Sequence, residues 1–337
     1  MTVGRERTDD TPAQHVSPTL ERLNSARQRL AESRRLRTGR NSEPVVREDR
    51  PAEEPPTMAA ERAAKFVANF STSGVGLEIG PSHNPIAPKS AGFDVRILDH
   101  KTQEGLRTKY EDHNVDIDAI EPVDFLWQGE RYIDLVGDQR FDWIIASHVI
   151  EHVPDLVGFI NDCLEILKPG GTLALVVPDM RCCFDALRPP SSLSELVDSH
   201  HAARVAPSPG QVADFYLNLA SRDDKTSWHP AEAGPWGSAV TITDALRFTN
   251  QAFKGRKHDV HVWRFTPTSL RLQLAQLGLL KMVETDAAFH QESAIGEFYI
   301  GLTHKAETST APTEQDLLAL ALQARHELAG FSPKNTD

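Results

Sequence analysis

The stretch Gly76-Leu77-Glu78-Ile79-Gly80-Pro81-Ser82-His83-Asn84 decides the fold class of this chain. A short apolar run over 75–79 stops at Gly80, which is the pattern of a buried strand followed by a loop of small residues. Parallel sheets bind ligands at the carboxyl ends of their strands. Gly80 lets backbone approach a ligand closely, and Glu78 offers a carboxylate to a cationic or hydroxylated group. We therefore predict a ligand-binding loop here.

A second acidic residue, Asp99, follows Glu78 by 21 positions and ends the next predicted strand, 94–98. In nucleotide-binding sheets, an acid about 20 residues after the first loop hydrogen-bonds the ribose hydroxyls. The loop and Asp99 together predict an adenosine-containing ligand.

Strands and helices alternate along the rest of the chain. Apolar runs predict further strands over 123–127, 141–147, 172–177, 281–285 and 298–303. Helical patterns cover 59–70, 156–167, 267–277 and 314–328. Such alternation predicts a parallel sheet wrapped by helices, with its last two strands paired as a hairpin-like edge. Lys168-Pro169-Gly170-Gly171 predicts a turn between the second of these helices and the following strand.

Two more motifs carry a family resemblance. They are Phe141-Asp142-Trp143-Ile144-Ile145-Ala146-Ser147-His148-Val149-Ile150-Glu151-His152-Val153 and Leu164-Glu165-Ile166-Leu167-Lys168-Pro169-Gly170-Gly171. With the first loop and Asp99, they make residues 70–305 resemble class I S-adenosylmethionine-dependent methyltransferases. The resemblance implies an α/β, Rossmann-like fold: a seven-stranded, mostly parallel sheet with one antiparallel strand and helices on both faces. It also implies S-adenosylmethionine as cofactor. The wording Leu-Glu-Ile-Gly-Pro-Ser-His-Asn-Pro is similar to a bacterial subgroup often encoded near genes for glycan or secondary-metabolite assembly.

The resemblance assigns cofactor contacts to matching positions. The residues expected to line the methionine part are Glu78, Ile79, Gly80, Pro81 and Ser82. Asp99 is expected to hold the ribose. The residues expected to border the adenine and to close the pocket are Leu126, Trp127, Gln128, Ser147 and His148. Pro81, Ser82 and Asn84 stand where the commoner family loop has Gly.

The segment His148-x-x-Glu151-His152 holds three chemically active side chains at the end of a predicted strand. An imidazole with an ordinary pKa near 6.5 can accept a hydroxyl proton during methyl transfer. A second interpretation is a divalent metal, because some members of the wider family place Glu and His here; His148 stands where those members carry Glu. A third is structural, with the pair capping the next helix or shaping the pocket. The three interpretations remain open at this stage.

The same five residues match the inverted zinc-peptidase pattern H-x-x-E-H. That pattern needs one long helix, whereas here it follows a predicted strand and precedes Pro154. A metal-dependent hydrolase is therefore a minor alternative.

Residues 181–262 interrupt the alternation with Pro, Ser, His and Trp clusters, which predicts an insertion or lid. Its aromatic and histidine side chains suit a sugar acceptor, since rings stack on sugars and imidazoles hydrogen-bond hydroxyls. The function expected is O-methylation of a sugar, glycan or related small molecule. The alternative from another class is a catalytically idle, cofactor-binding scaffold protein.

Composition limits the other possibilities. The 337 residues carry a net charge of −12, which argues against nucleic acid as a partner. No apolar run approaches the roughly 20 residues of a transmembrane helix, and no secretion signal is evident. The three cysteines, Cys163, Cys182 and Cys183, give no disulfide framework. We expect a cytoplasmic protein without a transmembrane segment.

The predicted domain order has three parts. Residues 1–57 are rich in Arg, Glu, Pro, Ser and Thr, which predicts a disordered arm. Within it, seven Arg face two acids over 21–40, so the arm either docks on an acidic partner or membrane surface or remains a solvated tail. The methyltransferase domain follows over 58–305, and a linker with a final helix occupies 306–337.

Overall fold

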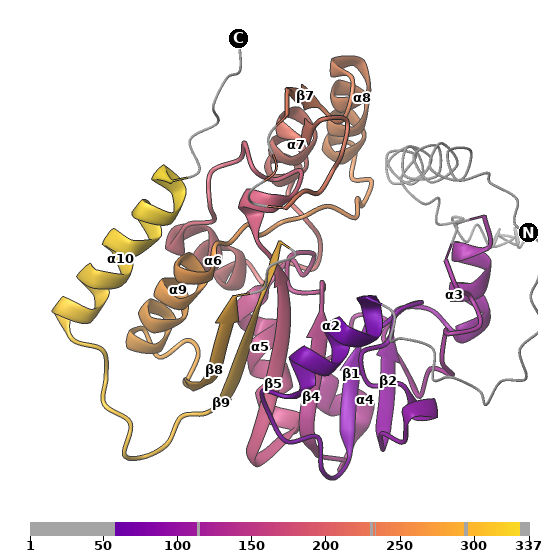
Figure 1. Ribbon diagram of the computed structural model, residues 1–337, viewed down its shortest axis with the longest axis vertical. Coiled ribbons are helices and arrows are strands. Elements are labelled where there is room, and N and C mark those ends of the chain that lie inside the picture. Colours follow the sequence, from indigo (N-terminus) through magenta and orange to yellow (C-terminus); the bar gives the residue numbers. More distant parts are fainter. Residues whose placement is uncertain (1–57, 113–114, 230–231, 233, 293–295, 331–337) are drawn as a thin grey trace, which may run out of the picture. The chain divides into compact units, whose positions relative to one another are not determined.

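The computed structural model describes residues 58–112, 115–229, 232, 234–292 and 296–330, and the predicted arm lies outside these ranges. The described residues contain a seven-stranded sheet of order β3-β2-β1-β4-β5-β9-β8 (Figure 1). Its strands are β1 (Gly76–Ile79), β2 (Val95–Asp99), β3 (Phe125–Leu126), β4 (Phe141–Ser147), β5 (Leu167–Pro178), β8 (Thr285–Glu292) and β9 (Glu297–His304).

One strand of the sheet is reversed. β1 pairs in parallel with β2 and β4, β2 with β3, and β4 with β5. β9 is antiparallel to both of its neighbours, β5 and β8. The predicted sheet, with one antiparallel strand and a hairpin-like edge, is confirmed.

Helices cover both faces of the sheet. On one face, apolar side chains of α4 (Tyr132–Val136), α5 (Leu156–Ile166) and α9 (Pro267–Leu279) share a core with Ile144 and Ala146 of β4. On the other face, α2 (Met58–Val67) packs through Phe66 against Trp143 and Ile145. In Figure 1, α2 crosses in front of β1 and β4. The alternation of β4 side chains between two cores explains why residues 143–146 are all apolar.

Gly76 is required by packing. A Cβ built on Gly76 would lie 2.1 Å from the indole of Trp143, which is fully buried. The absence of a side chain at Gly76 therefore makes room on β1 for the Trp143 ring of β4.

Two predicted boundaries differ from the structure. The run Lys168-Pro169-Gly170-Gly171 lies within β5 as a bulge, because Phe141 pairs with Leu167 while Trp143 pairs with Thr172. The predicted strand 281–285 is wrong, since β8 spans Thr285–Glu292. β8 is a half-exposed edge strand with a mostly polar sequence, so apolar periodicity does not mark it.

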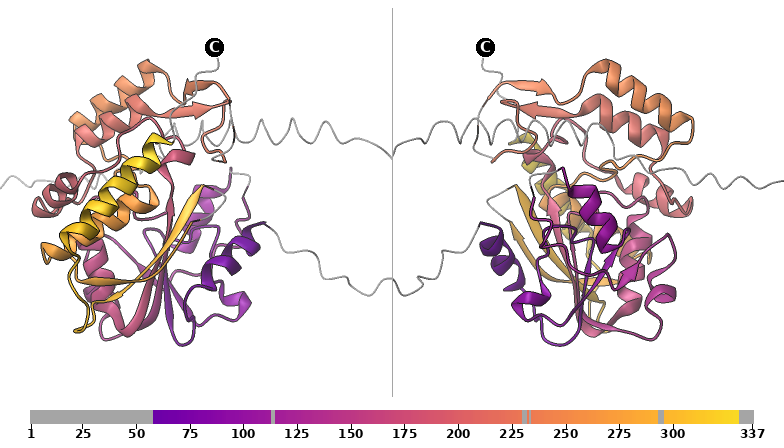
Figure 2. Two further views of the ribbon diagram at one scale, coloured as in Figure 1. Left: turned by 60° about the vertical axis from the view of Figure 1, so that its left-hand side comes forward. Right: turned by 90° about the vertical axis from the view of Figure 1, so that its right-hand side faces the viewer.

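The segment predicted as an insertion contains regular elements. They are η2 (Met180–Cys182), α6 (Leu193–His201), α7 (Pro209–Asn218), the paired strands β6 (Ala220–Arg222) and β7 (Trp236–Ser238), and α8 (Ile242–Phe253). Figures 1 and 2 show α7 and α8 beyond the end of the sheet at which β5 leads into this segment. The other short helices are η1 (Lys89–Ala91) and α3 (Gln103–Tyr110).

The final helix packs on the body of the protein. α10 (Glu314–Ala329) lies along α9, and the backbone N–H and hydroxyl of Thr268 both donate to the Glu327 carboxylate. No helix in the described part of the chain combines the length and apolar character that crossing a bilayer requires.

Candidate functional site

Three predicted site segments lie together at the carboxyl ends of β1, β2 and β4. Ile79 of β1 is in register with Leu98 of β2 on one side and with Ala146 of β4 on the other. The residues that follow, Gly80, Asp99 and Ser147, therefore lie at the carboxyl ends of three adjacent parallel strands. This is the edge at which sheets of this type bind ligands.

Glu78 holds the loop after β1 from beneath. Its Oε1 accepts a hydrogen bond from Ile86 N at 2.6 Å, and its Oε2 accepts one from Ala87 N at 3.1 Å. The side chain is 1% exposed. Burial raises its pKa to about 7, against the lowering effect of the two backbone donors. Glu78 fixes the shape of the 80–87 loop.

The loop itself leaves room and polarity for a ligand. Gly80 has φ +64°, and a Cβ built on it would meet Val149 Cγ2 at 3.3 Å. Ser82 also has a positive φ, and its buried Oγ has no hydrogen-bond partner among the described residues. A bare backbone turn with an unsatisfied hydroxyl fits a ligand that lies across it and hydrogen-bonds to Ser82. These two features fit the amino-acid part of S-adenosylmethionine.

Asp99 is buried at the end of β2. Its Oδ1 lies 2.7 Å from both the backbone N and the ring Nδ1 of His100. No described residue donates to its other oxygen, Oδ2. A buried carboxylate with a remaining acceptor atom fits the hydroxyls of a ribose.

The residues predicted to border the adenine continue from this point. Leu126 pairs with Asp99, and Trp127 N donates to Asp99 O at 2.9 Å. Gln128 N donates to Glu130 Oε2 at 2.8 Å, which closes a tight turn after β3. The three residues therefore follow directly beside the ribose position.

Ser147 and His148 belong to an ionic cluster. Glu297, at the start of β9, accepts hydrogen bonds from Arg62 Nε at 2.6 Å and lies 2.9 Å from His148 Nε2. Arg62 also donates to Ser147 Oγ at 3.1 Å. Burial lowers the pKa of His148, but hydrogen bonds with Glu151 and Glu297 outweigh it and raise the pKa to about 9. His148 has φ +54°, so the chain turns sharply where β4 ends.

Glu151 and His152 lie beside the end of the 181–262 segment. His152 Nδ1 is 2.8 Å from Asp259 Oδ1, and the ring packs edge-on against His261 at 4.7 Å between centroids. Burial lowers the pKa of His152, but Asp259 outweighs it and raises the pKa to about 9. Both imidazoles of the predicted motif are thus held as cations at neutral pH, which disfavours either as a proton acceptor there.

Two residues of this region, Asp185 and Asp259, were missed by sequence reasoning. His261 was expected only as one of the histidines of the 181–262 segment suited to a sugar. His261 Nδ1 lies 2.5 Å from Asp185 Oδ2, and Asp185 in turn pairs with the fully buried Arg188 at 2.6 Å. Single carboxylates in a polar segment carry no sequence signal for such a contact.

A metal ion would find its donors here in a different set from the predicted one. Glu151, His152 and His261 each offer a ligand atom within 4.8 Å of the others. His148, the predicted first ligand, is engaged by Glu297 instead.

The hydrolase alternative lacks its helix. β4 ends at Ser147, residues 148–152 form bends and turns, and α5 begins only at Leu156, capped by Asp155 through a 2.9 Å bond from Gly158 N. The H-x-x-E-H residues therefore do not share one helical face.

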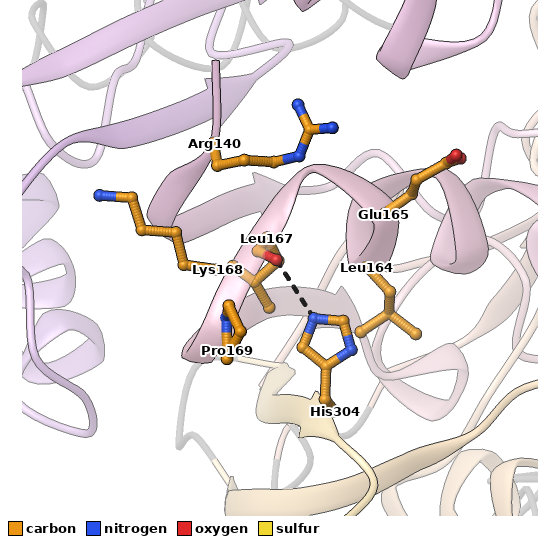
Figure 3. Close-up of a pocket in the computed structure, with 7 residues that line it drawn as sticks. All are labelled: Arg140, Leu164, Glu165, Leu167, Lys168, Pro169 and His304. Carbon is orange, nitrogen blue, oxygen red and sulfur yellow. Dashed lines mark hydrogen bonds between the residues drawn. The ribbon is translucent and has the colours of Figure 1, made fainter. Parts of the chain in front are cut away.

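The residues drawn in Figure 3 line a cavity of about 480 Å³ at the opposite end of the sheet, where β4 and β5 begin and β9 ends. Lys168 and Pro169 come from the bulge at the start of β5, and His304 Nε2 lies 3.2 Å from Leu167 O. None of the predicted site residues lines this cavity.

Known proteins share parts of this sequence. A family model described as "Methyltransferase domain" matches residues 57–283. Human mitochondrial ubiquinone biosynthesis O-methyltransferase is 51% identical over 35 residues, 10% of each chain. The mouse enzyme of that name is 32% identical over 119 residues, 29% of this chain and 31% of its own length. Sterol 24-C-methyltransferase of Eremothecium gossypii is 24% identical over 131 residues, which are 36% of this chain and 35% of its own length. The chain thus spans a tenth to about a third of these relatives.

Solved structures with a similar arrangement include the CcbJ methyltransferase of Streptomyces caelestis, with TM-score 0.39 and 14% identity over 76% of this chain and 100% of that one. The glycopeptide N-methyltransferase MtfA in complex with S-adenosylmethionine gives TM-score 0.37 and 14% identity over 77% and 100%. Because the family match covers more than half of the sequence, the chain belongs to this methyltransferase-domain family.

Proposed function

We propose that this enzyme transfers a methyl group to a hydroxyl oxygen of a small acceptor, a sugar, glycan or related molecule. The observation that carries the proposal is that two chemically different groups of residues lie side by side at the carboxyl ends of the central strands. The loop after β1 and Asp99 form one, and the imidazole and carboxylate groups after β4 form the other. The first suits a nucleoside, and the second suits a hydroxylated acceptor.

Bound S-adenosylmethionine supplies an activated methyl group on a sulfonium centre. The loop residues Gly80, Pro81 and Ser82, on the base set by Glu78 and Ile79, are assigned to its amino-acid part. Asp99 is assigned to the ribose. The residues assigned to the adenine and the pocket floor are Leu126, Trp127, Gln128 and Ser147. Holding the reactants in line is the main contribution such a site makes, up to about 7 to 11 kcal/mol.

His148, Glu151 and His152 are assigned to the acceptor side. With its pKa raised to about 9, the His152 imidazole is assigned to donate a hydrogen bond to the acceptor at neutral pH. His148, whose two ring nitrogens face Glu151 and Glu297, is assigned to contribute positive charge there. A base role for His152 becomes available only as the pH rises toward 9, so turnover that depends on it must increase over that range. Turnover that is flat from pH 7 to 9 would remove His152 as the base.

Support for an oxygen acceptor comes from the relatives named as ubiquinone biosynthesis O-methyltransferases. The 181–262 segment brings Asp259 and His261 beside His152, and we propose that it acts as a lid over the acceptor. On its Leu-Glu-Ile-Gly-Pro-Ser-His-Asn-Pro motif, we assign the chain to the bacterial subgroup associated with glycan or secondary-metabolite genes. The Arg-rich arm is assigned to docking a partner.

A second candidate is an idle, cofactor-binding scaffold protein. It is favoured by one feature: Pro81, Ser82 and Asn84 replace the glycines of the commoner loop. This candidate predicts cofactor binding without transfer to any acceptor.

The test uses the full chain in two assays. Calorimetry with S-adenosylmethionine measures cofactor binding, and transfer to a panel of sugars and glycans is followed by mass spectrometry as the gain of one CH₂ unit. Binding with transfer to a hydroxyl supports the proposal. Cofactor binding without methyl transfer to any molecule in extracts of cells that carry or lack the gene supports the scaffold protein. Transfer to a nitrogen or carbon atom contradicts the proposed oxygen acceptor.

A further inference from the structure

α8 presents an apolar stripe to solvent. Ile242, Leu246 and Phe253 are 74%, 50% and 68% exposed. They follow one another at intervals of four and seven positions, which puts all three on one side of a helix. Ala245 and Phe248, on another side, are buried in the core. Exposed apolar side chains are common singly, but three in line on one helix mark an interaction surface.

Cationic side chains flank this stripe. Residues 242–257 contain four basic side chains and one acid, which gives +3 in a chain whose net charge is −12. The acid, Asp244, pairs with Arg247 at 2.9 Å. The other three basic side chains are exposed and form no ion pair with a described residue; they are Lys254, Arg256 and Lys257. The end of α8 and the turn after it are therefore locally basic on an acidic protein.

The helix is held in place from its inner side only. α8 lies away from the sheet and beside α7 (Figures 1 and 2). Phe248 of α8 stacks on Tyr216 of α7 at 4.6 Å between ring centroids. The stripe is thus carried by a helix that the core fixes, and its apolar side chains project outward from a convex surface. Such a surface suits a soft, flat partner better than one that must supply a shaped groove.

We propose that this face of α8, formed by Ile242, Leu246 and Phe253 with the basic side chains of 247–257, binds the surface of an anionic lipid bilayer. A helix with an exposed apolar side and flanking Lys and Arg lies in the interface of a membrane. There its apolar side chains enter the boundary of headgroups and acyl chains, and its cations contact lipid phosphates. This lipid contact goes beyond the proposed function and does not depend on it.

Charge disfavours two other occupants of the same face. Residues 21–40 hold seven Arg against two acids, so the predicted arm is repelled by the basic side chains of 247–257. A second copy of the chain, paired through the same patch, brings these basic side chains against themselves. A bilayer that contains anionic lipids meets both the apolar stripe and its cations.

The test is vesicle sedimentation with the full chain. Binding to vesicles made of equal parts phosphatidylglycerol and phosphatidylcholine is expected to be at least tenfold stronger than binding to phosphatidylcholine alone. It is expected to weaken as salt is raised, because salt screens the attraction between the cations and the headgroups. Absence of binding to the anionic vesicles overturns the proposal, and a partner of another kind, such as an acidic protein, then has to be sought.

Two combined variants separate α8 from the Arg-rich arm, which both variants retain. One carries Leu246→Ser and Phe253→Ser and lacks most of the stripe. The other carries Lys254→Gln, Arg256→Gln and Lys257→Gln and lacks the unpaired cations. Each is expected to weaken binding to the anionic vesicles at least tenfold. Wild-type affinity in either variant overturns the proposal, because the arm or another surface then makes the contact.

Matched controls lie elsewhere on the chain. Leu318→Ser with Leu322→Ser removes two side chains of α10 that are 60% and 59% exposed. Arg107→Gln, Lys281→Gln and Arg325→Gln remove three exposed cations and change the net charge by the same amount as the α8 variant. Both controls are expected to bind like the wild type, and circular dichroism checks the folding of every variant. A tenfold loss in the charge control overturns the assignment to α8, since net charge alone then decides binding.

Discussion

The loop after β1 (80–87) and a second part of the site, called the wall here, are held in different ways. The wall consists of Glu151 and His152 after β4 together with Asp185, Asp259 and His261. The loop is secured locally, by one carboxyl group that accepts two backbone hydrogen bonds from residues eight and nine positions later. The wall is secured by long-range ionic contacts, such as Asp185 with His261, which are 76 positions apart. The cofactor half of the site is thus a local structure, and the acceptor half exists only in the folded chain.

The difference also concerns charge. Burial raises the pKa of Glu78 to about 7 despite its two backbone hydrogen bonds, so the loop rests on a group that is partly neutral at physiological pH. Burial also raises the pKa of Asp185, but His261 and Arg188 outweigh it and lower the pKa to about 2. The wall therefore depends on charge pairing, and the loop depends on hydrogen bonds to a carboxyl group.

The largest effect is expected from breaking the wall. Asp185→Ala removes the 2.6 Å partner of the fully buried Arg188, which keeps the partly exposed Asp214 at 2.8 Å, and it also removes the carboxylate beside His261. Removal of one member of a buried pair costs about 3 to 5 kcal/mol, and the remaining Asp214 contact puts the expected loss at the lower end of that range. Denaturant unfolding measures the loss. Asp198→Ala, at an exposed position on α6, is the matched control and is expected to stay within about 0.5 kcal/mol. A loss below about 1 kcal/mol in Asp185→Ala would mean that the wall does not depend on this pair.

The loop is expected to respond to pH through Glu78. Its native pKa lies above the unfolded value of 4.5, so the native state binds more protons. The resulting stability is fully present below pH 4.5 and is lost as the pH rises through 7, by roughly 3 kcal/mol. The free energy of unfolding of wild type minus that of Glu78→Gln should fall by this amount from pH 4.5 to 8. Glu307→Gln, at an exposed position, should show no such trend.

Asp99→Ala tests the cofactor half by binding. Loss of the ribose acceptor is expected to weaken S-adenosylmethionine at least tenfold, about 1.4 kcal/mol, measured by calorimetry. Asp94→Ala is the matched control, because Asp94 precedes the same strand and its side chain is 58% exposed. Equal affinities of the two variants would remove the ribose role.

The smallest effect on cofactor affinity is expected at Gly80. Gly80→Ala places a side chain at φ +64° and 3.3 Å from Val149 Cγ2, which costs about 1 to 2 kcal/mol of stability and weakens the cofactor several-fold. Gly92→Ala incurs a similar backbone cost at φ +89° but contacts nothing within 4 Å. It should therefore leave cofactor affinity unchanged. Wild-type affinity in Gly80→Ala would show that the ligand does not lie across this turn.

Sequence prediction succeeded where an element has one dominant signal. β4 was predicted with its observed ends because it is buried on both faces and therefore apolar over 143–146. The predicted third strand extended over 123–127, but only Phe125–Leu126 pair. β8 was displaced because an exposed edge strand needs no apolar alternation. Boundaries fail where hydrogen-bond pairing, which no local pattern reports, decides the element.

Local patterns were enough to predict the alternating strands and helices and to put Glu78, Gly80 and Asp99 at strand ends, because apolar runs and turn residues are short-range signals. The reversed strand came from the family resemblance. Which groups lie beside Glu151 and His152 became known only from the folded chain. His261 and Asp259 reach them because backbone hydrogen bonds from 262–263 to Glu151 bring distant segments together. Contacts of that kind depend on how the chain packs, and side-chain identity alone does not encode them.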